Sequence, residues 1–171
     1  MTEVDFYVLD KADDEALLRT ACRITQAACS QGLRVYVLLN TDQEAARMDD
    51  LLWTFQQDSF VAHERWYGAR NASAPPTAQH GDTTDSMQQI MPESMAISTT
   101  STMARVLIGT TTELPATPEL LVNLGAPVPA WVAQCPRVAE IVGGDPHRKA
   151  ESRQRYRRYR EQGVPLRTHE V

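Results

Sequence analysis

Leu33-Arg-Val-Tyr-Val-Leu-Leu39 is a short, almost continuous apolar run. Such runs are typical of strands that are buried on both faces of a parallel sheet. An earlier run near the N-terminus, Val4-Asp-Phe-Tyr-Val-Leu9, is also short and rich in β-branched and aromatic residues. The residues between the two runs have helical spacing, so this part of the chain predicts a strand, a helix and a second strand.

The helix between these strands is indicated by small and apolar residues spaced four, three and four positions apart. They are Leu17, Ala21, Ile24 and Ala28. Gly32 is expected to end the helix as its C-terminal cap. After the second strand, Thr41-Asp-Gln-Glu44 has the S/T-x-x-E form of a capping box, which predicts the start of a second helix. This alternation predicts an α/β fold with right-handed crossovers, a mostly parallel sheet and helices on its faces.

The second half of the chain contains three further strand candidates, at 105–109, 120–124 and 137–142. Before them, residues 69–98 are dominated by small and polar side chains. This composition predicts a mobile loop insertion whose deletion leaves the fold intact. A length of 171 residues suits one hydrophobic core, so we expect a single domain over residues 1–171 that carries this flexible insertion.

The composition is that of an ordinary globular protein, with 42% hydrophobic and 23% charged residues. No apolar run approaches the roughly 18 residues of a membrane helix, and the N-terminus lacks the pattern of a signal peptide. The three cysteines lack CxxC spacing, which predicts reduced thiols and a cytoplasmic protein. Cys22 and Cys29 are expected to point into the core as small hydrophobes.

Residues 147–160 form a dense cationic segment in an otherwise acidic chain. They contain seven of the 17 Lys and Arg residues and one of the 22 Asp and Glu residues, a charge of +6. The remaining 10 basic and 21 acidic residues leave −11 on the rest of the chain, which gives the net charge of −5. Asp145-Pro146 supplies a cap and a first-turn proline, so we expect a helix here. The charge asymmetry indicates an anionic partner.

In a helix, four residues of this segment fall within about 60° of one another and form one stripe. They are Lys149, Arg153, Tyr156 and Arg160. One aromatic ring among three cations suits a ligand that combines carboxylates with an apolar end. A solvated basic helix without a specific partner is the alternative interpretation of the same pattern.

The chain contains none of the common catalytic motifs. Neither apolar run is followed by G-x-G-x-x-G, and G-x-x-x-x-G-K-[ST] and G-x-S-x-G are absent. The four histidines lack the spacing of metal ligands. Asp10, Asp49 and Asp50 are conceivable as a carboxylate site, but a strand end and a solvated helix face explain them more simply. We therefore expect no catalytic residue, no metal, no cofactor and no enzyme activity.

Five aromatic residues lie within fifteen positions. They are Trp53, Phe55, Phe60, Trp66 and Tyr67. Residues 52–61 are expected to be a helix end followed by an edge strand, with Trp53 ending the helix and Phe60 opening the strand. Two interpretations remain open. Either the rings close one edge of the core, or Trp53 and Phe60 form the apolar centre of a protein–protein interface.

Several short motifs, taken in order, resemble those of a known family. They are Phe6-Tyr-Val-Leu9, Gly32-Leu-Arg-Val35, Leu52-Trp53, Ser59-Phe-Val-Ala-His63, Val122-Asn-Leu124, Arg137-Val-Ala-Glu-Ile-Val142, and Arg155-Tyr-Arg-Arg-Tyr-Arg160 with Gly163. Together they span nearly the whole chain and resemble the chi subunits of the bacterial DNA polymerase III holoenzyme. The resemblance implies a single Rossmann-like α/β domain without nucleotide chemistry.

The resemblance also implies a function. Chi subunits are non-catalytic adaptors of the clamp-loader complex that bridge the psi subunit to the acidic C-terminal tail of single-stranded DNA-binding protein. By position, the implied tail-binding residues are Val142, Lys149, Arg153, Tyr156 and Arg157. The implied psi-binding residues are Trp53 and Phe60.

Direct nucleic-acid binding by the basic segment is the alternative function, because Arg and Tyr also contact phosphates and bases. The charge of −11 on the rest of the chain would repel a long polyanion, so a short acidic peptide is the favoured ligand. A nucleotide-using enzyme has only the analogy of fold in its favour.

Overall fold

The computed structural model describes residues 1–56, 60–68 and 104–171. Its strands are β1 (Glu3–Val8), β2 (Val35–Leu38), β3 (His63–Trp66), β4 (Val106–Gly109), β5 (Leu120–Asn123), β6 (Arg137–Val142) and β7 (Leu166–Glu170). Its helices are α1 (Asp14–Ser30), α2 (Asp42–Thr54), the 3-10 helix η2 (Ala130–Gln134) and α3 (Pro146–Glu161).

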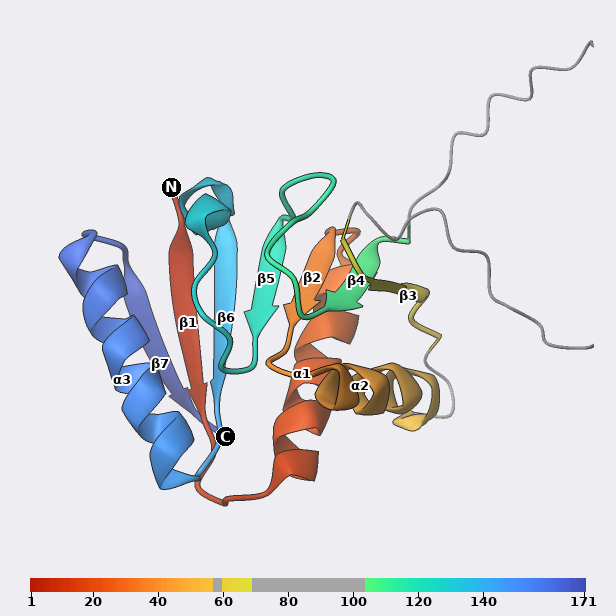
Figure 1. Cartoon of the computed structure of the whole chain (residues 1–171), viewed down its shortest axis with the longest axis horizontal. Coiled ribbons are helices and arrows are strands. Elements are labelled where there is room, and N and C mark those ends of the chain that lie inside the picture. Colours follow the sequence, from red (N-terminus) through yellow and green to blue (C-terminus); the bar gives the residue numbers. More distant parts are fainter. Residues whose placement is uncertain (57–59, 69–103) are drawn as a thin grey trace, which may run out of the picture.

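The strands form one open sheet in the order β3-β4-β2-β5-β6-β1-β7 (Figure 1). Every pairing within the described residues is parallel. The predicted α/β class is therefore confirmed, and five of the strands coincide with predicted ones to within one or two residues. Because all strands run the same way, their carboxyl ends meet at one edge of the sheet.

Helices cover both faces of this sheet, and alternate strand residues contribute to two separate apolar layers. In β2, Val37 packs in the layer that contains Met48 of α2, whereas Tyr36 packs in the layer that contains Tyr159 of α3. The helices α1 and α2 thus cover one face, while α3 and η2 cover the other. Burial on both faces explains why the strands are continuously apolar rather than alternating.

The helix boundaries follow the predicted caps. Helix α1 ends just before Gly32, whose φ of 79° is a left-handed conformation that suits glycine. At the start of α2, the Thr41 hydroxyl accepts the backbone N–H of Glu44 at 3.2 Å. The Glu44 carboxylate accepts the backbone N–H of Asn40, also at 3.2 Å, one residue before the cap.

Two edge strands differ from the sequence-based expectation. Strand β7 was not predicted, because four of its five residues are exposed and it has no hydrophobic period; pairing with β1 holds it in place. Strand β3 begins at His63, so Phe60 precedes the strand instead of opening it. The predicted insertion at 69–98 lies outside the described residues, and its mobility stays a prediction.

A buried polar network joins α3 to the middle of the sheet. Glu140 of β6 is fully buried, and its carboxylate accepts hydrogen bonds from Arg155 Nε at 2.9 Å and the Tyr159 hydroxyl at 2.9 Å. Asn123 of β5 donates to the same carboxylate at 3.0 Å. Burial raises the pKa of Glu140, and these donors, led by the Arg155 charge, oppose that rise. Every oxygen of this buried acid therefore has a partner, as burial of a charge requires.

We expect Tyr159→Phe to destabilise the protein by about 1–3 kcal/mol, because Glu140 would lose a donor in a site that water cannot reach. Urea denaturation measures this change. Tyr156→Phe is the matched control, since within the described residues the Tyr156 hydroxyl has no hydrogen-bond partner; its effect should stay below about 0.5 kcal/mol. Equal losses in the two variants would contradict a special role for the network.

Candidate functional site

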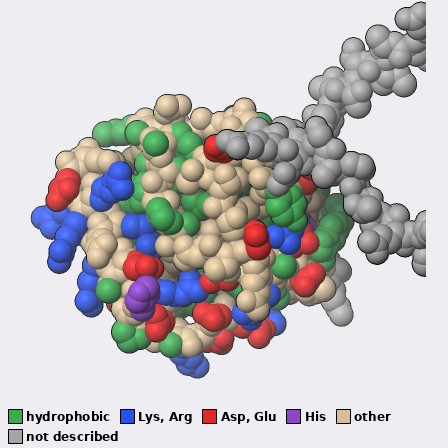
Figure 2. Space-filling model, in the orientation of Figure 1, with side chains coloured by type: hydrophobic (Ala, Val, Ile, Leu, Met, Phe, Trp, Pro, Cys, Tyr) green, Lys and Arg blue, Asp and Glu red, His purple; other side chains and the backbone are tan. Residues whose placement is uncertain are grey.

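The basic segment forms helix α3 as predicted. Asp145 caps it by accepting the backbone N–H of Arg148 at 3.0 Å, and Pro146 occupies the first turn. The helix ends at Glu161, and Gly163 follows with a φ of 71°. Lys and Arg side chains gather on the surface of the molecule over this helix (Figure 2).

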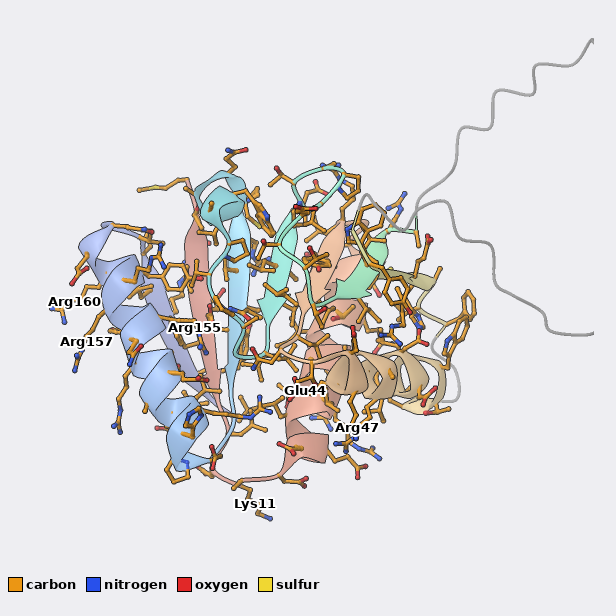
Figure 3. All side chains as sticks on the ribbon, viewed as in Figure 1. Lys11, Glu44, Arg47, Arg155, Arg157 and Arg160 are labelled. Carbon is orange, nitrogen blue, oxygen red and sulfur yellow. The ribbon has the colours of Figure 1, made fainter. Side chains whose placement is uncertain are left out.

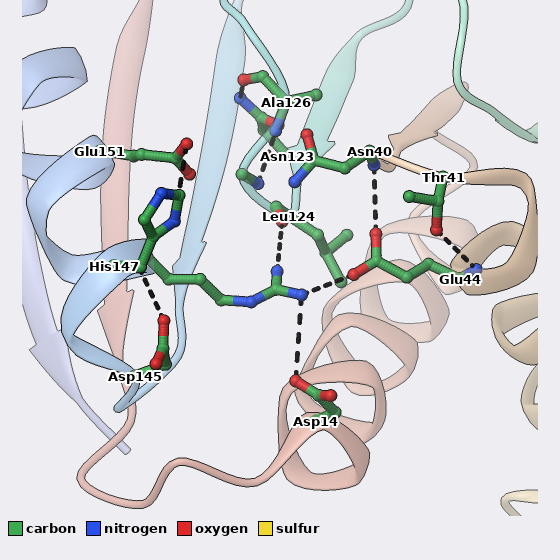
Figure 4. A network of polar contacts seen from close by, with 12 residues as sticks. Asp14, Asn40, Thr41, Glu44, Asn123, Leu124, Ala126, Asp145, His147 and Glu151 are labelled. Carbon is green, nitrogen blue, oxygen red and sulfur yellow. Dashed lines mark hydrogen bonds and ion pairs between the residues drawn. The ribbon is translucent and has the colours of Figure 1, made fainter.

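Two arginines of α3 pair with acidic residues inside the protein. Arg155 binds Glu140, as described above. Arg148 donates to the backbone oxygen of Leu124 at 3.0 Å and pairs with Glu44 of α2 at 2.5 Å, with Asp14 of α1 at 3.9 Å (Figure 4). These contacts fix the first turn of α3 against the helices of the opposite layer.

The predicted stripe forms on the outer side of α3. We call Lys149, Arg153, Tyr156 and Arg160 the basic stripe. None of its three cations takes part in an ion pair within the described residues. Arg157 lies beside it, and Figure 3 shows Arg157 and Arg160 pointing away from the sheet, whereas Arg155 points toward it.

Tyr156 supplies the apolar part of the basic stripe. Its side chain is 36% exposed, and its ring packs edge-on against Phe6 of β1, with the ring centroids 5.2 Å apart. Because Phe6 is itself buried, the exposed face of Tyr156 is held in a defined place. Cations around a fixed ring can bind a carboxylate group and an adjacent apolar group together.

Val142, the remaining residue of the implied tail-binding set, lies below this surface. It ends β6 and is only 4% exposed. It belongs to the apolar layer that also contains Phe6 and Tyr159, because its side chain points to the face that α3 covers. Val142 therefore supports the helix from beneath and presents almost no surface to a ligand.

The edge strand β3 lies at the opposite end of the sheet from α3 (Figure 1). Trp53, in the last turn of α2, and Phe60, three residues before β3, come together there. Their ring centroids are 5.2 Å apart, and the two residues are 51% and 74% exposed. We call this pair the aromatic surface. Tyr67 follows β3 and is also exposed, with the Arg65 guanidinium 5.1 Å from its ring centre. These three rings thus lie on the surface, whereas Phe55 and Trp66 are partly buried and pack against the core.

His63 supports the aromatic surface from below. Its ring lies 4.7 Å from the Trp53 ring between centroids, and its Nε2 is 2.9 Å from the Asp49 carboxylate of α2. Its Nδ1 is 2.7 Å from the backbone oxygen of Val61. These contacts connect β3 to α2 and hold the His63 ring against the exposed Trp53 indole.

The described residues contain no group of three or more His, Cys, Asp or Glu side chains that could hold a metal ion. None of the helices in the described ranges has the length and hydropathy that crossing a bilayer requires. Cys22 is buried among apolar residues as predicted, and burial raises its pKa to about 12; Cys29 is half-buried. Burial likewise raises the pKa of Cys135 to about 11.

The inward-facing arginines of α3 were missed by the sequence reasoning, although a signal exists. Arg148, Ser152, Arg155 and Tyr159 are spaced four, three and four residues apart, the same spacing as the buried stripe of α1. Such a polar stripe can be buried only against acids from other elements. Those acids, Glu44 and Glu140, are far away in the sequence and cannot be paired with α3 from the sequence alone.

The fold and the two surfaces define a class of protein: an open, parallel α/β domain with a cationic helix at one end of its sheet and exposed aromatic rings at the other. Residues 1–167 match the family described as DNA polymerase III chi subunit, HolC. The DNA polymerase III subunit chi of Pseudomonas aeruginosa is 30% identical over 171 residues, which is 100% of this chain and 98% of that relative. The chain belongs to the DNA polymerase III chi subunit family.

Phe60→Ala is expected to change the free energy of unfolding by less than about 0.5 kcal/mol, because the ring is largely exposed. Leu52→Ala, one residue before Trp53 and fully buried, is the control and should cost about 2–5 kcal/mol. Thermal and urea denaturation measure both. A large loss for Phe60→Ala would return this ring to the core and remove it from the aromatic surface.

Proposed function

We propose that this chi-family protein is a non-catalytic adaptor of the clamp-loader complex. Its basic stripe binds the acidic C-terminal tail of single-stranded DNA-binding protein, and its aromatic surface binds the psi subunit. The observation that carries the proposal is the group of cations around Tyr156 that have no ion pair within the described residues, on an otherwise acidic chain. The protein requires no cofactor for this role and acts in the cytoplasm, where the chromosome is replicated.

The basic stripe suits a peptide that ends in acidic residues, an apolar side chain and a free carboxylate. The planar guanidinium of Arg153 can hold a carboxylate through two parallel hydrogen bonds, and Lys149 adds a compact charge one turn earlier. Arg157 extends the cationic surface. The Tyr156 ring offers the apolar contact, in the manner of a site that captures a C-terminal carboxylate.

The charge distribution favours a short peptide over a long polyanion. Of the seven cations in 147–160, Arg148 and Arg155 are neutralised by Glu44 and Glu140, so five have no acidic partner in the described part of the chain. The acidic residues elsewhere would repel a nucleic acid that extends beyond α3. Direct nucleic-acid binding remains the alternative function. It predicts that oligo-dT binds α3 as tightly as the tail peptide, which a competition titration tests.

The aromatic surface suits a protein partner. Trp and other large aromatic residues are common anchors of protein–protein interfaces, and a pair of adjoining rings provides the apolar centre that such anchors need. Trp53 and Phe60 are exposed side by side, and the His63 ring packs against Trp53. Because this surface lies at the opposite end of the sheet from α3, psi and the tail can bind at the same time.

Arg153→Ala is expected to weaken binding of an acidic tail peptide about ten- to hundredfold, from the loss of a charge-assisted contact worth about 1.5–3 kcal/mol. Isothermal titration calorimetry measures the affinity, which should also fall as salt is raised. Arg158→Ala, with the same charge change on the other flank of α3, is the matched control and should bind nearly normally. If Arg153→Ala binds as tightly as the wild type, the tail site lies elsewhere.

Phe60→Ala is expected to weaken psi binding by about 2 kcal/mol or more while leaving tail binding unchanged. Arg153→Ala should show the reverse pattern, which provides the control for each surface. A psi pull-down followed by calorimetry on the purified proteins measures both affinities. Normal psi binding by a correctly folded Phe60→Ala protein would exclude the aromatic surface as the psi site.

A further inference from the structure

A separate cavity of about 420 Å³ lies on the other flank of α3. Its lining residues are Asn40, Gly125, Pro127, Val128, Glu151, Gln154, Arg155 and Arg158. On the helix, Arg158 lies about 180° from Lys149, at 100° per residue. The cavity is therefore distinct from the basic stripe, although the same helix forms a wall of both.

The cavity occupies a position where open parallel sheets commonly bind ligands. Asn40 follows β2 and Gly125 follows β5, and these strands are neighbours in the sheet. After β2 the chain turns to α2 on one face, whereas after β5 it turns to η2 on the opposite face. Such a change of direction between neighbouring strands opens a crevice at their carboxyl ends, and ligands bind there in many α/β proteins.

In this protein a carboxylate of the chain itself occupies the position where such a crevice usually binds an anion. In nucleotide-binding folds the phosphate lies at a helix N-terminus and contacts backbone N–H groups. Here the Glu44 carboxylate lies at the N-terminus of α2, where it accepts the N–H of Asn40 and pairs with Arg148 (Figure 4). An anion in this cavity must therefore bind the side chains of α3.

Two guanidinium groups on α3, those of Arg155 and Arg158, line the cavity and can bind an anion there. Arg155 is held by Glu140 through Nε and by the backbone oxygen of Gly125 through Nη1, at 3.3 Å. Its Nη2 has no partner within the described residues, so it is oriented in advance for a ligand. Arg158 lies three residues later on the same side of the helix and has no ion pair in the described part of the chain. Paired guanidinium groups favour carboxylate and phosphate oxygens.

The other end of the cavity has different chemistry. Glu151 lies seven residues before Arg158, about 10 Å along the helix axis. It would repel an anion and accept hydrogen bonds from an amino group. Pro127 and Val128 give one wall an apolar surface, and the amide of Gln154 lies between the two charged ends in sequence.

We propose that this cavity binds a small molecule that has a carboxylate or phosphate group at one end and an amino group at the other. The oxyanion binds Arg155 and Arg158, the amino group faces Glu151, and the middle of the ligand packs on Val128. Acidic amino acids and the monophosphates of adenosine, guanosine and cytidine have this chemistry. The site goes beyond the adaptor role and does not depend on it.

The test uses the full-length protein labelled with ¹⁵N, titrated with deoxyadenosine monophosphate and, separately, with L-glutamate. Sodium chloride at matched ionic strength is the blank. We expect at least one probe to shift the Nε–Hε resonances of Arg155 and Arg158 until the shift saturates. The probe that saturates shows whether the site prefers a phosphate or a carboxylate. Intermolecular NOEs from the bound probe to the Val128 methyl groups locate it in the wild-type protein.

Two variants separate this site from the basic stripe. Arg158→Ala, an exposed position, should weaken the probe about tenfold or more, whereas Arg157→Ala on the outer side of α3 should bind it normally. The proposal is overturned if neither probe gives a saturable shift. It is also overturned if Arg158→Ala binds normally or if both variants lose the same affinity, which would indicate general charge attraction.

Discussion

The buried ion pair between Arg155 and Glu140 determines how the basic helix lies on the sheet. Glu140 is the one fully buried acid of the described core, and removing a partner from such a pair typically costs about 3–5 kcal/mol. With Tyr159 and Asn123 completing the network, α3 has only one rotation about its axis that satisfies the buried carboxylate. That rotation turns the basic stripe outward and places the cavity residues toward β2 and β5. Both candidate binding sites on α3 therefore depend on Glu140, which is fully buried and which neither ligand would touch.

The parallel sheet keeps the proposed partners apart. From β3, beside the aromatic surface, to β1, under Tyr156, the order β3-β4-β2-β5-β6-β1 contains five strand spacings, or about 24 Å. A sheet of this width would let the proposed psi site and the proposed tail site be occupied together without contact between the two partners. This is the geometry that an adaptor needs, and it requires no movement of the domain.

The same structure shows how an α/β fold can retain a crevice at its switch point without the usual phosphate seat. The chain lacks the glycine-rich turn, and the Glu44 carboxylate occupies the N-terminus of α2 in place of a bound anion. Arg148 then neutralises Glu44 and joins α3 to α2. The Glu44 carboxylate thus occupies the position that a bound anion has in nucleotide-binding folds. Through Arg148 it also links α2 on one face of the sheet to α3 on the other.

The sequence by itself determined the local structure. The apolar runs, the Thr41 cap, Gly32 and the Asp145-Pro146 pair predicted five strands and three helices, because these signals act over a few residues. The outward stripe of α3 also followed from helical spacing alone. Only the tertiary structure decided which cations are free, since the acids that neutralise Arg148 and Arg155 lie in distant parts of the chain. It also decided the place of β7, which has no hydrophobic period and is held by pairing with β1, and the burial of Val142 beneath α3. Contacts between distant residues leave no local pattern, so they become visible only when the sheet is assembled.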